Sequence, residues 1–170
     1  DLDGFKPIND IYGHGAGDEV LVQVSARLKT IMHERGVIAR VGGDEFAIFA
    51  PGLESEAEVL ALGQDMKQAL EEPIKIGDIV ARLTCSSGFS LYPASGTDLE
   101  RLIDRADMAL YKAKAQERGS SLLFDADFET SAFERATIEQ ELRAAIVNQA
   151  LDVYFQPIVG LDTGELIGFE

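Results

Sequence analysis

Two short β-favouring runs, residues 37–41 and 46–50, are separated by only four residues, Gly42-Gly43-Asp44-Glu45. A connection this short that begins with glycine makes the two runs turn back on each other as an antiparallel hairpin. Two adjacent carboxylates, Asp44 and Glu45, then stand at the tip of the hairpin. Because an acidic turn is most often simply solvated, its meaning depends on what lies beside it.

The segments on either side of this hairpin carry helix signals. Val20, Val24 and Leu28 recur at helical spacing after Gly17 and predict an apolar stripe that faces a core. Ser55 and Glu58 have the spacing of a capping box, which predicts a helix that ends before Pro73.

The following segment predicts a second hairpin, with strands at 74–76 and 79–91. Cys85 falls on the apolar face of the longer strand and is expected to be a buried core thiol. Thr97 to Glu100 is interpreted as another capping box. It begins a helix whose inward face is expected to hold Leu99, Leu102, Ile103, Ala106, Leu110 and Ala113.

The order of these elements is not the strict alternation of strand and helix that builds a doubly wound parallel sheet. With residues 121–124 as a closing strand, the sequence predicts an α+β fold. We expect a mainly antiparallel central sheet flanked by helices.

Charge and composition exclude several functions. The chain of 170 residues has 15 basic and 30 acidic side chains, a formal net charge of −15. It has no cationic face for nucleic acid or anionic lipid, so neither partner is expected. No apolar stretch is long enough to cross a bilayer, and the single cysteine predicts a reducing compartment. We therefore expect a cytoplasmic protein, or the cytoplasmic portion of a membrane-bound sensor.

Asp1 and Asp3 form a second acidic group at the beginning of the chain. Residues i and i+2 of a strand share a face, so the two carboxylates point together and Leu2 points the other way. If this strand lies beside the hairpin, the carboxylates converge with Asp44. Like charges at such distances repel unless a cation lies between them, and oxygen ligands select Mg²⁺ or Mn²⁺. Substrate phosphates usually complete the coordination shell of such an ion, so a metal site here predicts nucleotide chemistry.

Two further features fit a nucleotide. Gly42 and Gly43 lack side chains, so backbone N–H groups can approach a phosphate closely. Lys114 and Arg118 lie four residues apart and share a helix face if the helix extends that far, where they could hold β- and γ-phosphates. The alternative is that both are ordinary cations at the last turn of a helix.

Three motifs together resemble a known family. Residues 42–46 read Gly-Gly-Asp-Glu-Phe, residues 1–10 read Asp-Leu-Asp-Gly-Phe-Lys-Pro-Ile-Asn-Asp, and residues 109–114 read Ala-Leu-Tyr-Lys-Ala-Lys. In this order they resemble the GGDEF family of diguanylate cyclases over about residues 1–124. The resemblance implies a fold related to adenylate cyclases and polymerase palms. It also implies condensation of two GTP molecules to cyclic di-GMP and two pyrophosphates by a homodimer.

The resemblance also implies roles for single residues. The metal ligands would be the carboxylates of Asp1 and Asp44 and the carbonyl of Leu2, with Glu45 assisting, and Asp44 would also be the base for the ribose 3′-hydroxyl. The residues matched to substrate binding are Asn9 and Asp18 for guanine, Phe5 and Lys6 with Gly42 and Gly43 near the phosphates, and Lys114 and Arg118 for the triphosphate. For Asn9 and Asp18 the alternative is that they cap the short and the long helix.

The rest of the chain resembles the opening of an EAL phosphodiesterase domain. Residues 154–159 and 168–170 carry this likeness, with Glu170 at the family's metal-binding glutamate. We predict a GGDEF domain at 1–124 whose first strand is incomplete, a polar linker at 125–137, and the start of an EAL domain at 138–170. So short a piece of EAL domain is not expected to hydrolyse cyclic di-GMP, and a sensor domain is expected upstream.

Two other functions remain open at this point. The first is a GTP-binding regulatory module that controls an attached EAL phosphodiesterase. The second is a scaffold that binds no nucleotide. Residues 117–119, Glu-Arg-Gly, also depart from the family's usual Gly-Arg-Asn, which puts the conformation around Arg118 in question.

Overall fold

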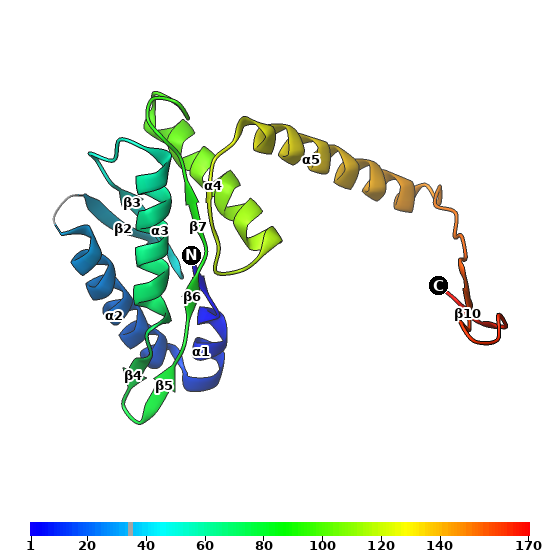
Figure 1. The fold of residues 1–170 in the computed structure, drawn as a ribbon, viewed down its shortest axis with the longest axis horizontal. Helices are drawn as coiled ribbons and strands as arrows, with labels where there is room; N and C mark the ends of the chain where they lie inside the picture. Colours follow the sequence, from blue (N-terminus) through cyan, green and yellow to red (C-terminus); the bar gives the residue numbers. More distant parts are fainter. Residues whose placement is uncertain (34–35) are drawn as a thin grey trace. The chain divides into compact units, whose positions relative to one another are not determined.

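The structure, a computed structural model, describes the backbone of residues 1–33 and 36–170 and the side chains of these residues apart from 131–136 and 139. The chain divides into two compact units, Asp1–Glu129 and Thr130–Glu170. The first unit contains the helices α1 to α4 and the strands β1 to β8 (Figure 1).

Two helices follow the short strand β1 (Leu2–Asp3). They are α1 (Phe5–Tyr12) and α2 (His14–Met32), with the positive-φ residue Gly13 at φ 83° between them. The predicted stripe of Val20, Val24 and Leu28 is buried in the core. The second helix begins at His14, earlier than its apolar pattern indicates, since its first turn has no apolar period.

The predicted first hairpin is confirmed. Strands β2 (Val37–Gly42) and β3 (Glu45–Phe49) pair antiparallel, with Val37 opposite Phe49 and Gly42 opposite Glu45. Gly43, at φ 50°, takes the left-handed conformation that the turn requires. The Nε of Arg40 donates to the carbonyl of Gly43 at 2.9 Å, which ties the turn to its own strand.

Helix α3 (Glu56–Glu71) begins with the predicted capping box. The Ser55 side chain accepts from the Glu58 amide, and the Glu58 carboxylate accepts from the Ser55 amide. The Glu58 carboxylate also accepts from the Glu54 amide at 2.7 Å, and this bond, with smaller contributions from Ser55, holds the pKa of Glu58 below its usual value. The end of the helix is closed by Arg27, whose guanidinium donates to three carbonyls at 2.6–2.9 Å, those of Ala69, Glu72 and Pro73.

The prediction of one continuous strand over residues 79–91 is wrong. The hairpin of β4 (Ile74–Ile76) and β5 (Ile79–Ala81) forms as expected, but the chain then continues as β6 (Thr84–Cys85) and β7 (Ser87–Phe89). The interruption arises because the segment changes partner. β5 pairs with β4, β6 pairs antiparallel with β1, and β7 pairs in parallel with β8 (Ser121–Leu123). Cys85 is buried, as predicted, and burial raises the pKa of its thiol.

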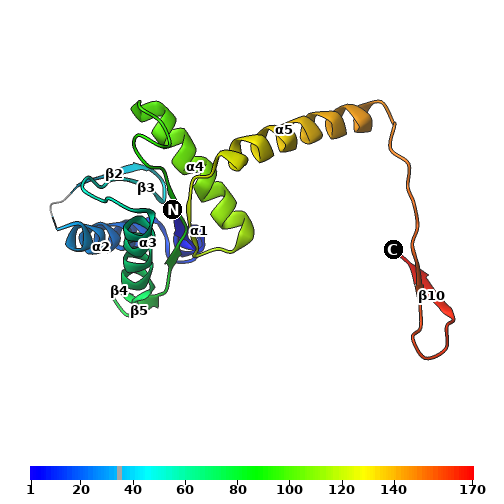
Figure 2. The same cartoon turned by 45° about the horizontal axis from the view of Figure 1, so that its top comes forward.

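Helix α4 (Leu99–Gln116) packs on one face of β7 and β8, and α3 packs on the other (Figures 1 and 2). A Cβ on Gly88 would overlap the α4 backbone, whereas the ring of its neighbour Phe89 lies against Gly63 of α3. Consecutive strand residues point to opposite faces, so this pair of contacts defines the two layers.

Two parts of the prediction for α4 are wrong, its inward face and its N-cap, and the close approach at Gly88 explains the first. The buried residues of this helix are the small Ala109 and Ala113, while the side chains of Leu99 and Ile103 are exposed. The N-cap is Asp98, whose side chain accepts from the amide of residue 101, and not Thr97 as the capping-box interpretation required. The α+β class itself is confirmed, with one parallel pair among the mostly antiparallel strands.

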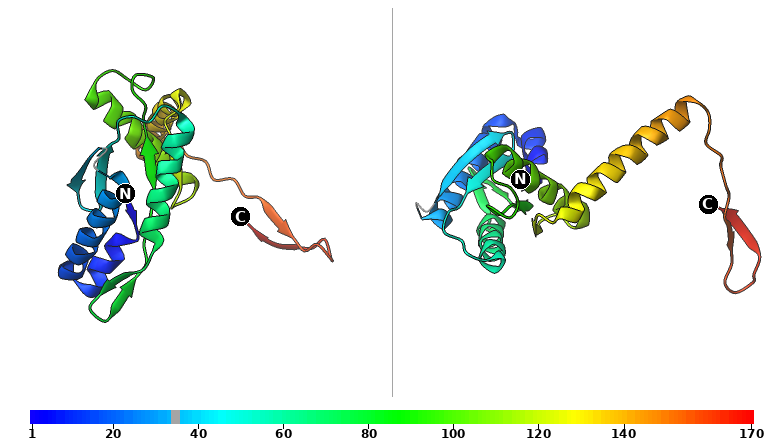
Figure 3. Two further views of the ribbon diagram at one scale, coloured as in Figure 1. Left: turned by 60° about the vertical axis from the view of Figure 1, so that its left-hand side comes forward. Right: turned by 90° about the horizontal axis from the view of Figure 1, so that it is seen from above.

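The residues predicted as a polar linker are helical, because α5 runs over Ala126–Val147. A linker can be helical, so the predicted domain boundaries stay a prediction. The hairpin of β9 (Pro157–Val159) and β10 (Leu166–Phe169) lies in the second unit, in orange and red in Figure 3. Among the described residues, we find no helix that combines the length and the apolar character needed to cross a membrane.

Candidate active site

The end of strand β1 lies beside the tip of the β2–β3 hairpin. The amide of Leu2 donates to the carbonyl of Asp44 at 3.2 Å, and on the other side the amide of Ser86 donates to the carbonyl of Asp1 at 3.0 Å. The first acidic segment and the Gly-Gly-Asp-Glu turn are therefore neighbours. Leu2 points into the core, with 2% of its surface exposed.

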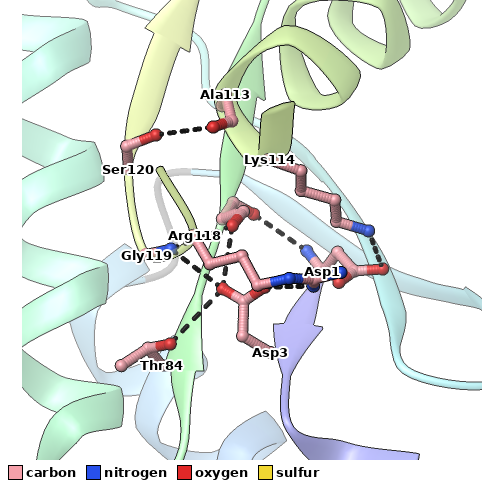
Figure 4. A network of polar contacts seen from close by, with 9 residues as sticks. Asp1, Asp3, Thr84, Ala113, Lys114, Arg118, Gly119 and Ser120 are labelled. Carbon is pink, nitrogen blue, oxygen red and sulfur yellow. Dashed lines mark hydrogen bonds and ion pairs between the residues drawn. The ribbon is translucent and has the colours of Figure 1, made fainter. Parts of the chain in front are cut away.

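Asp1 is paired with the lysine predicted to bind phosphate. The Nζ of Lys114 lies 2.7 Å from an oxygen of Asp1, and both side chains are largely shielded from water. Lys114 reaches down from the last turn of α4 toward the strand end (Figure 4). A shielded pair of this kind is a stronger contact than an exposed one, because less solvent screens it.

Asp3 is the most heavily hydrogen-bonded carboxylate of this region. It is 7% exposed, and it accepts from Ser86 Oγ at 2.8 Å, the Gly119 amide at 3.1 Å and Thr84 Oγ1 at 3.3 Å. It also forms an ion pair with Arg118 at 3.0 Å. Burial alone would raise the pKa of Asp3, but the bonds from Ser86, Arg118 and Gly119 outweigh it and hold the pKa below its usual value.

Lys114 and Arg118 were expected to share a helix face only if the helix extends to residue 118, and this condition is not met. Helix α4 ends at Gln116, and Glu117 has an extended backbone with φ −160°. Arg118 lies in the turn that follows, where Gly119 has φ 77°. Arg118 nevertheless reaches the same strand end as Lys114, because Asp3 draws its guanidinium back toward β1 (Figure 4).

The glycine pair lies where the sequence places it, at the hairpin tip. Around Gly42 and Gly43 the structure has no described atom within 4 Å of the place that a Cβ would occupy. The turn is open on this side, as the approach of a phosphate requires. Asp44 is half-buried and Glu45, the first residue of β3, is exposed.

Phe5 and Lys6, which the family resemblance places near the phosphates, form the first turn of α1. Phe5 is buried in the core, and Lys6 is exposed. Among the described residues no side chain caps this helix, whose N-cap is Gly4 at φ 82°. The first-turn amides are therefore left for other acceptors.

Asn9 lies against Gly17 of α2, the residue that precedes Asp18 in the sequence. A Cβ on Gly17 would overlap Oδ1 of Asn9 and lie 2.9 Å from its Cγ, so the absence of a side chain at 17 makes room for the amide. The alternative that Asn9 and Asp18 cap helices is wrong. They lie inside α1 and α2, whose N-caps are Gly4 and Gly13.

The oxygen donors expected for a metal have the chemistry that Mg²⁺ prefers, namely carboxylates and a backbone carbonyl. Two of the carriers, Leu2 and Asp44, are joined by a backbone hydrogen bond. Within the described part of the chain, however, no three His, Cys, Asp or Glu side chains are grouped so that they could enclose a metal ion. The donor types fit, and the metal-ligand roles of Asp1, Leu2, Asp44 and Glu45 stay predictions.

Sequence reasoning missed Ser86 and Gly119 as parts of this site, and it gave Asp3 no role beyond its place in the first acidic group. The alternation along the strand did indicate that Asp3 points the same way as Asp1, and the structure agrees, since both carboxylates meet cations from the end of α4. No sequence signal revealed that Ser86, far along the chain, is the partner of Asp3.

Comparison with known proteins was made on both sequence and structure. The family model described as "Diguanylate cyclase, GGDEF domain" matches residues 1–120. The cyclic di-GMP phosphodiesterase NbdA of Pseudomonas aeruginosa is 37% identical over 166 residues, covering 98% of this chain and 21% of that protein. The bifunctional diguanylate cyclase/cyclic di-GMP phosphodiesterase MucR of the same organism is 35% identical, covering 100% of this chain and 25% of that protein.

Among solved structures, the GGDEF domain of TpbB (YfiN) from P. aeruginosa superposes with a TM-score of 0.74 at 37% identity. The match covers 78% of this chain and 77% of that one. The chain thus spans about a fifth to a quarter of the length of the curated relatives NbdA and MucR.

Proposed function

The chain belongs to the GGDEF family, and from this premise we propose that it is a diguanylate cyclase that joins two GTP molecules into cyclic di-GMP. In each step the 3′-oxygen of one GTP attacks the α-phosphorus of the other. The bond from that phosphorus to the bridging oxygen of the β-phosphate breaks, and pyrophosphate leaves. Two such steps close the ring, so two copies of the chain, each holding one GTP, face each other as a homodimer.

Lys114 and Arg118 are the groups that would bind the triphosphate. Each is paired with a carboxylate, Asp1 or Asp3, close to the Gly-Gly-Asp-Glu turn. Phosphate oxygens would replace the Asp1 carboxylate at Lys114, while the guanidinium of Arg118 has further N–H groups for them. In an otherwise acidic protein these two cations offset the repulsion that a triphosphate would meet.

Asp44 would accept the proton of the attacking 3′-hydroxyl. Mg²⁺ or Mn²⁺ would neutralise the charge that develops on the phosphates. The residues that would hold this ion are Asp1, Asp44 and Glu45, together with the carbonyl of Leu2.

The remaining predicted residues would position the substrate. Asn9 and Asp18 would hydrogen-bond the edge of guanine, which offers both donors and acceptors to an amide and a carboxylate. The backbone of Phe5, Lys6, Gly42 and Gly43 would approach the phosphates.

The observation that supports this proposal most directly is the hydrogen bond from the Leu2 amide to the Asp44 carbonyl. It places the backbones of the two acidic segments side by side, and the proposal requires in addition that their carboxylates converge on one ion. Asp1, which precedes Leu2, forms an ion pair with Lys114. A cation of the kind that binds phosphate therefore lies at the same strand end as the acidic residues.

The test is formation of cyclic di-GMP and pyrophosphate from GTP by the full chain in Mg²⁺. Below the dissociation constant of the dimer, the rate should rise with the square of protein concentration. Asp44→Ala should abolish the product, whereas Asp78→Ala, at the exposed turn of the β4–β5 hairpin, should not. Product formation by Asp44→Ala, or none by the native chain at any concentration, would refute the proposal.

A second function is a regulatory GTP-binding module for an attached phosphodiesterase. It is favoured by the relative NbdA, which is named a cyclic di-GMP phosphodiesterase although the similarity includes the GGDEF region. Binding of Mg·GTP by calorimetry with no turnover would support it. If calorimetry detects no Mg·GTP binding, only a scaffold that binds no nucleotide remains.

In the whole protein we propose an upstream sensor and a downstream EAL domain, with the GGDEF unit in the cytoplasm. Residues 154–159 and 168–170 support the EAL domain, and MucR is named as having both activities. Phosphodiesterase activity is not expected from the 170 residues alone. A role in cyclic di-GMP signalling is common to all of these alternatives.

A further inference from the structure

One buried carboxylate, Asp3, connects three segments that are distant in sequence. It lies on β1, and its partners come from the β6–β7 segment and from the turn between α4 and β8. Ser86 Oγ, itself fully buried, also accepts from the Gly119 amide at 3.1 Å. The amide of Gly119, next to Arg118 in the turn, is therefore shared between two acceptors, Asp3 Oδ2 and Ser86 Oγ.

The two oxygens of Asp3 have different partners. Oδ2 accepts from the neutral donors Ser86, Thr84 and Gly119, and Oδ1 accepts from the guanidinium of Arg118 at 3.0 Å. One oxygen therefore anchors the turn, and the other orients the cation.

Without a partner that orients it, the Arg118 side chain would contribute little to the binding of an anion. It lies beyond the end of α4, and its side chain is 67% exposed. An arginine in this position loses much rotamer freedom when it is fixed on a ligand. A buried carboxylate that holds one N–H in advance reduces that loss and leaves other N–H groups of the fork free to meet an anion.

We propose that Asp3 is a positioning residue for GTP, acting through Arg118, an inference that rests on the proposed function. The opposite effect is also physically reasonable, because a carboxylate near a triphosphate repels it. The two effects predict opposite signs when the charge of Asp3 is removed. Positioning predicts weaker GTP binding, and repulsion predicts tighter binding.

The variant that separates the effects is Asp3→Asn. Three donors meet Oδ2, so the amide oxygen will occupy that place and the NH₂ group will face Arg118. The anchor is kept and the link to Arg118 is cut. Asp78→Asn, the same change at an exposed turn, controls for net charge.

Binding of Mg·GTP to the full chain is measured by calorimetry, with KM and kcat where turnover is observed. We expect Asp3→Asn to weaken binding about 3- to 30-fold and to raise KM with kcat nearly unchanged. In an Arg118→Ala background the same change should have no further effect, since Asp3 acts through Arg118. Unchanged or tighter binding by Asp3→Asn, or an equal loss in both backgrounds, overturns the inference.

A measurement on the native chain keeps the test valid if Asp3→Asn does not fold. The guanidinium resonances of Arg118, measured by NMR without nucleotide, should show slowed rotation, and averaged resonances like those of a free arginine would overturn the inference. If the native chain binds no Mg·GTP, both the proposed function and this inference fail. If it binds Mg·GTP and only the Asp3 results disagree, the inference alone fails.

Discussion

Replacing Gly17 by alanine should weaken GTP binding without unfolding the protein. Gly17 lies in the second turn of α2, where a Cβ would overlap Oδ1 of Asn9 and lie 3.2 Å from Cζ of Phe5. The overlapping atom is the end of a short flexible side chain, so Asn9 can rotate away. It then leaves the position from which we propose that it reads guanine.

The stability terms for Gly17→Ala nearly cancel. Alanine is better than glycine inside a helix by about 1 kcal/mol, and forcing Asn9 off its rotamer costs about 0.5–1.5 kcal/mol. The binding terms do not cancel, because the amide would lose about two hydrogen bonds to the base. At about 0.5–1.5 kcal/mol each, this weakens binding by roughly 5- to 150-fold.

The matched control is Gly15→Ala, one position from the start of the same helix. No described atom lies within 4 Å of the Cβ that this change adds. It should bind Mg·GTP like the native chain, with equal or greater stability. Calorimetry with Mg·GTP and Mg·ATP, together with urea unfolding, measures all the quantities involved. If Gly17→Ala retains both the affinity and the guanine preference of Gly15→Ala, the assignment of Asn9 is refuted.

Four other changes test the packing described above. Gly88→Ala should lower the free energy of unfolding in urea by about 3 kcal/mol, because its Cβ meets the backbone of α4. Arg27→Ala should lower it by about 1–3 kcal/mol, since three carbonyls at the end of α3 lose their donor; no change would contradict this. The pKa of Asp3 is lowered in the folded protein, so its charge stabilises the fold above about pH 4. In urea unfolding, the native chain should therefore be more stable than Asp3→Asn at pH 7, and this difference in free energy should shrink as the pH falls through the lowered pKa. Glu129→Gln removes a half-exposed ion pair with Arg105 at 2.8 Å, and hydrogen exchange at the start of α5 should become faster, with a loss of at most about 1 kcal/mol.

The sequence predicted the elements whose signals are local. The hairpin with Gly42 and Gly43 at its tip needs only two adjacent runs and a short turn, and it is confirmed. The capping box at Ser55 and the buried stripe at Val20, Val24 and Leu28 depend only on helical spacing, and both are confirmed. The family was also readable from the sequence, because its motifs are contiguous strings of residues.

Predictions that depend on a distant partner were less successful. Leu99 and Ile103 look like core residues by periodicity, but α4 turns its small residues inward because Gly88 brings a strand against it. The stretch 79–91 looks like one strand, yet it pairs in turn with β4, β1 and β8.

The family, the fold class and the acidic turn could therefore be predicted from the amino-acid sequence alone, since motifs, periodicity, caps and turn residues act over a few positions. Tertiary structure decided which charges meet: Lys114 pairs with Asp1, and Arg118, outside the helix on which spacing would place it, pairs with Asp3. The physical reason is that an ion pair depends on distance in space, and residues 3, 86 and 118 become neighbours only when the strands and the turn have been packed together.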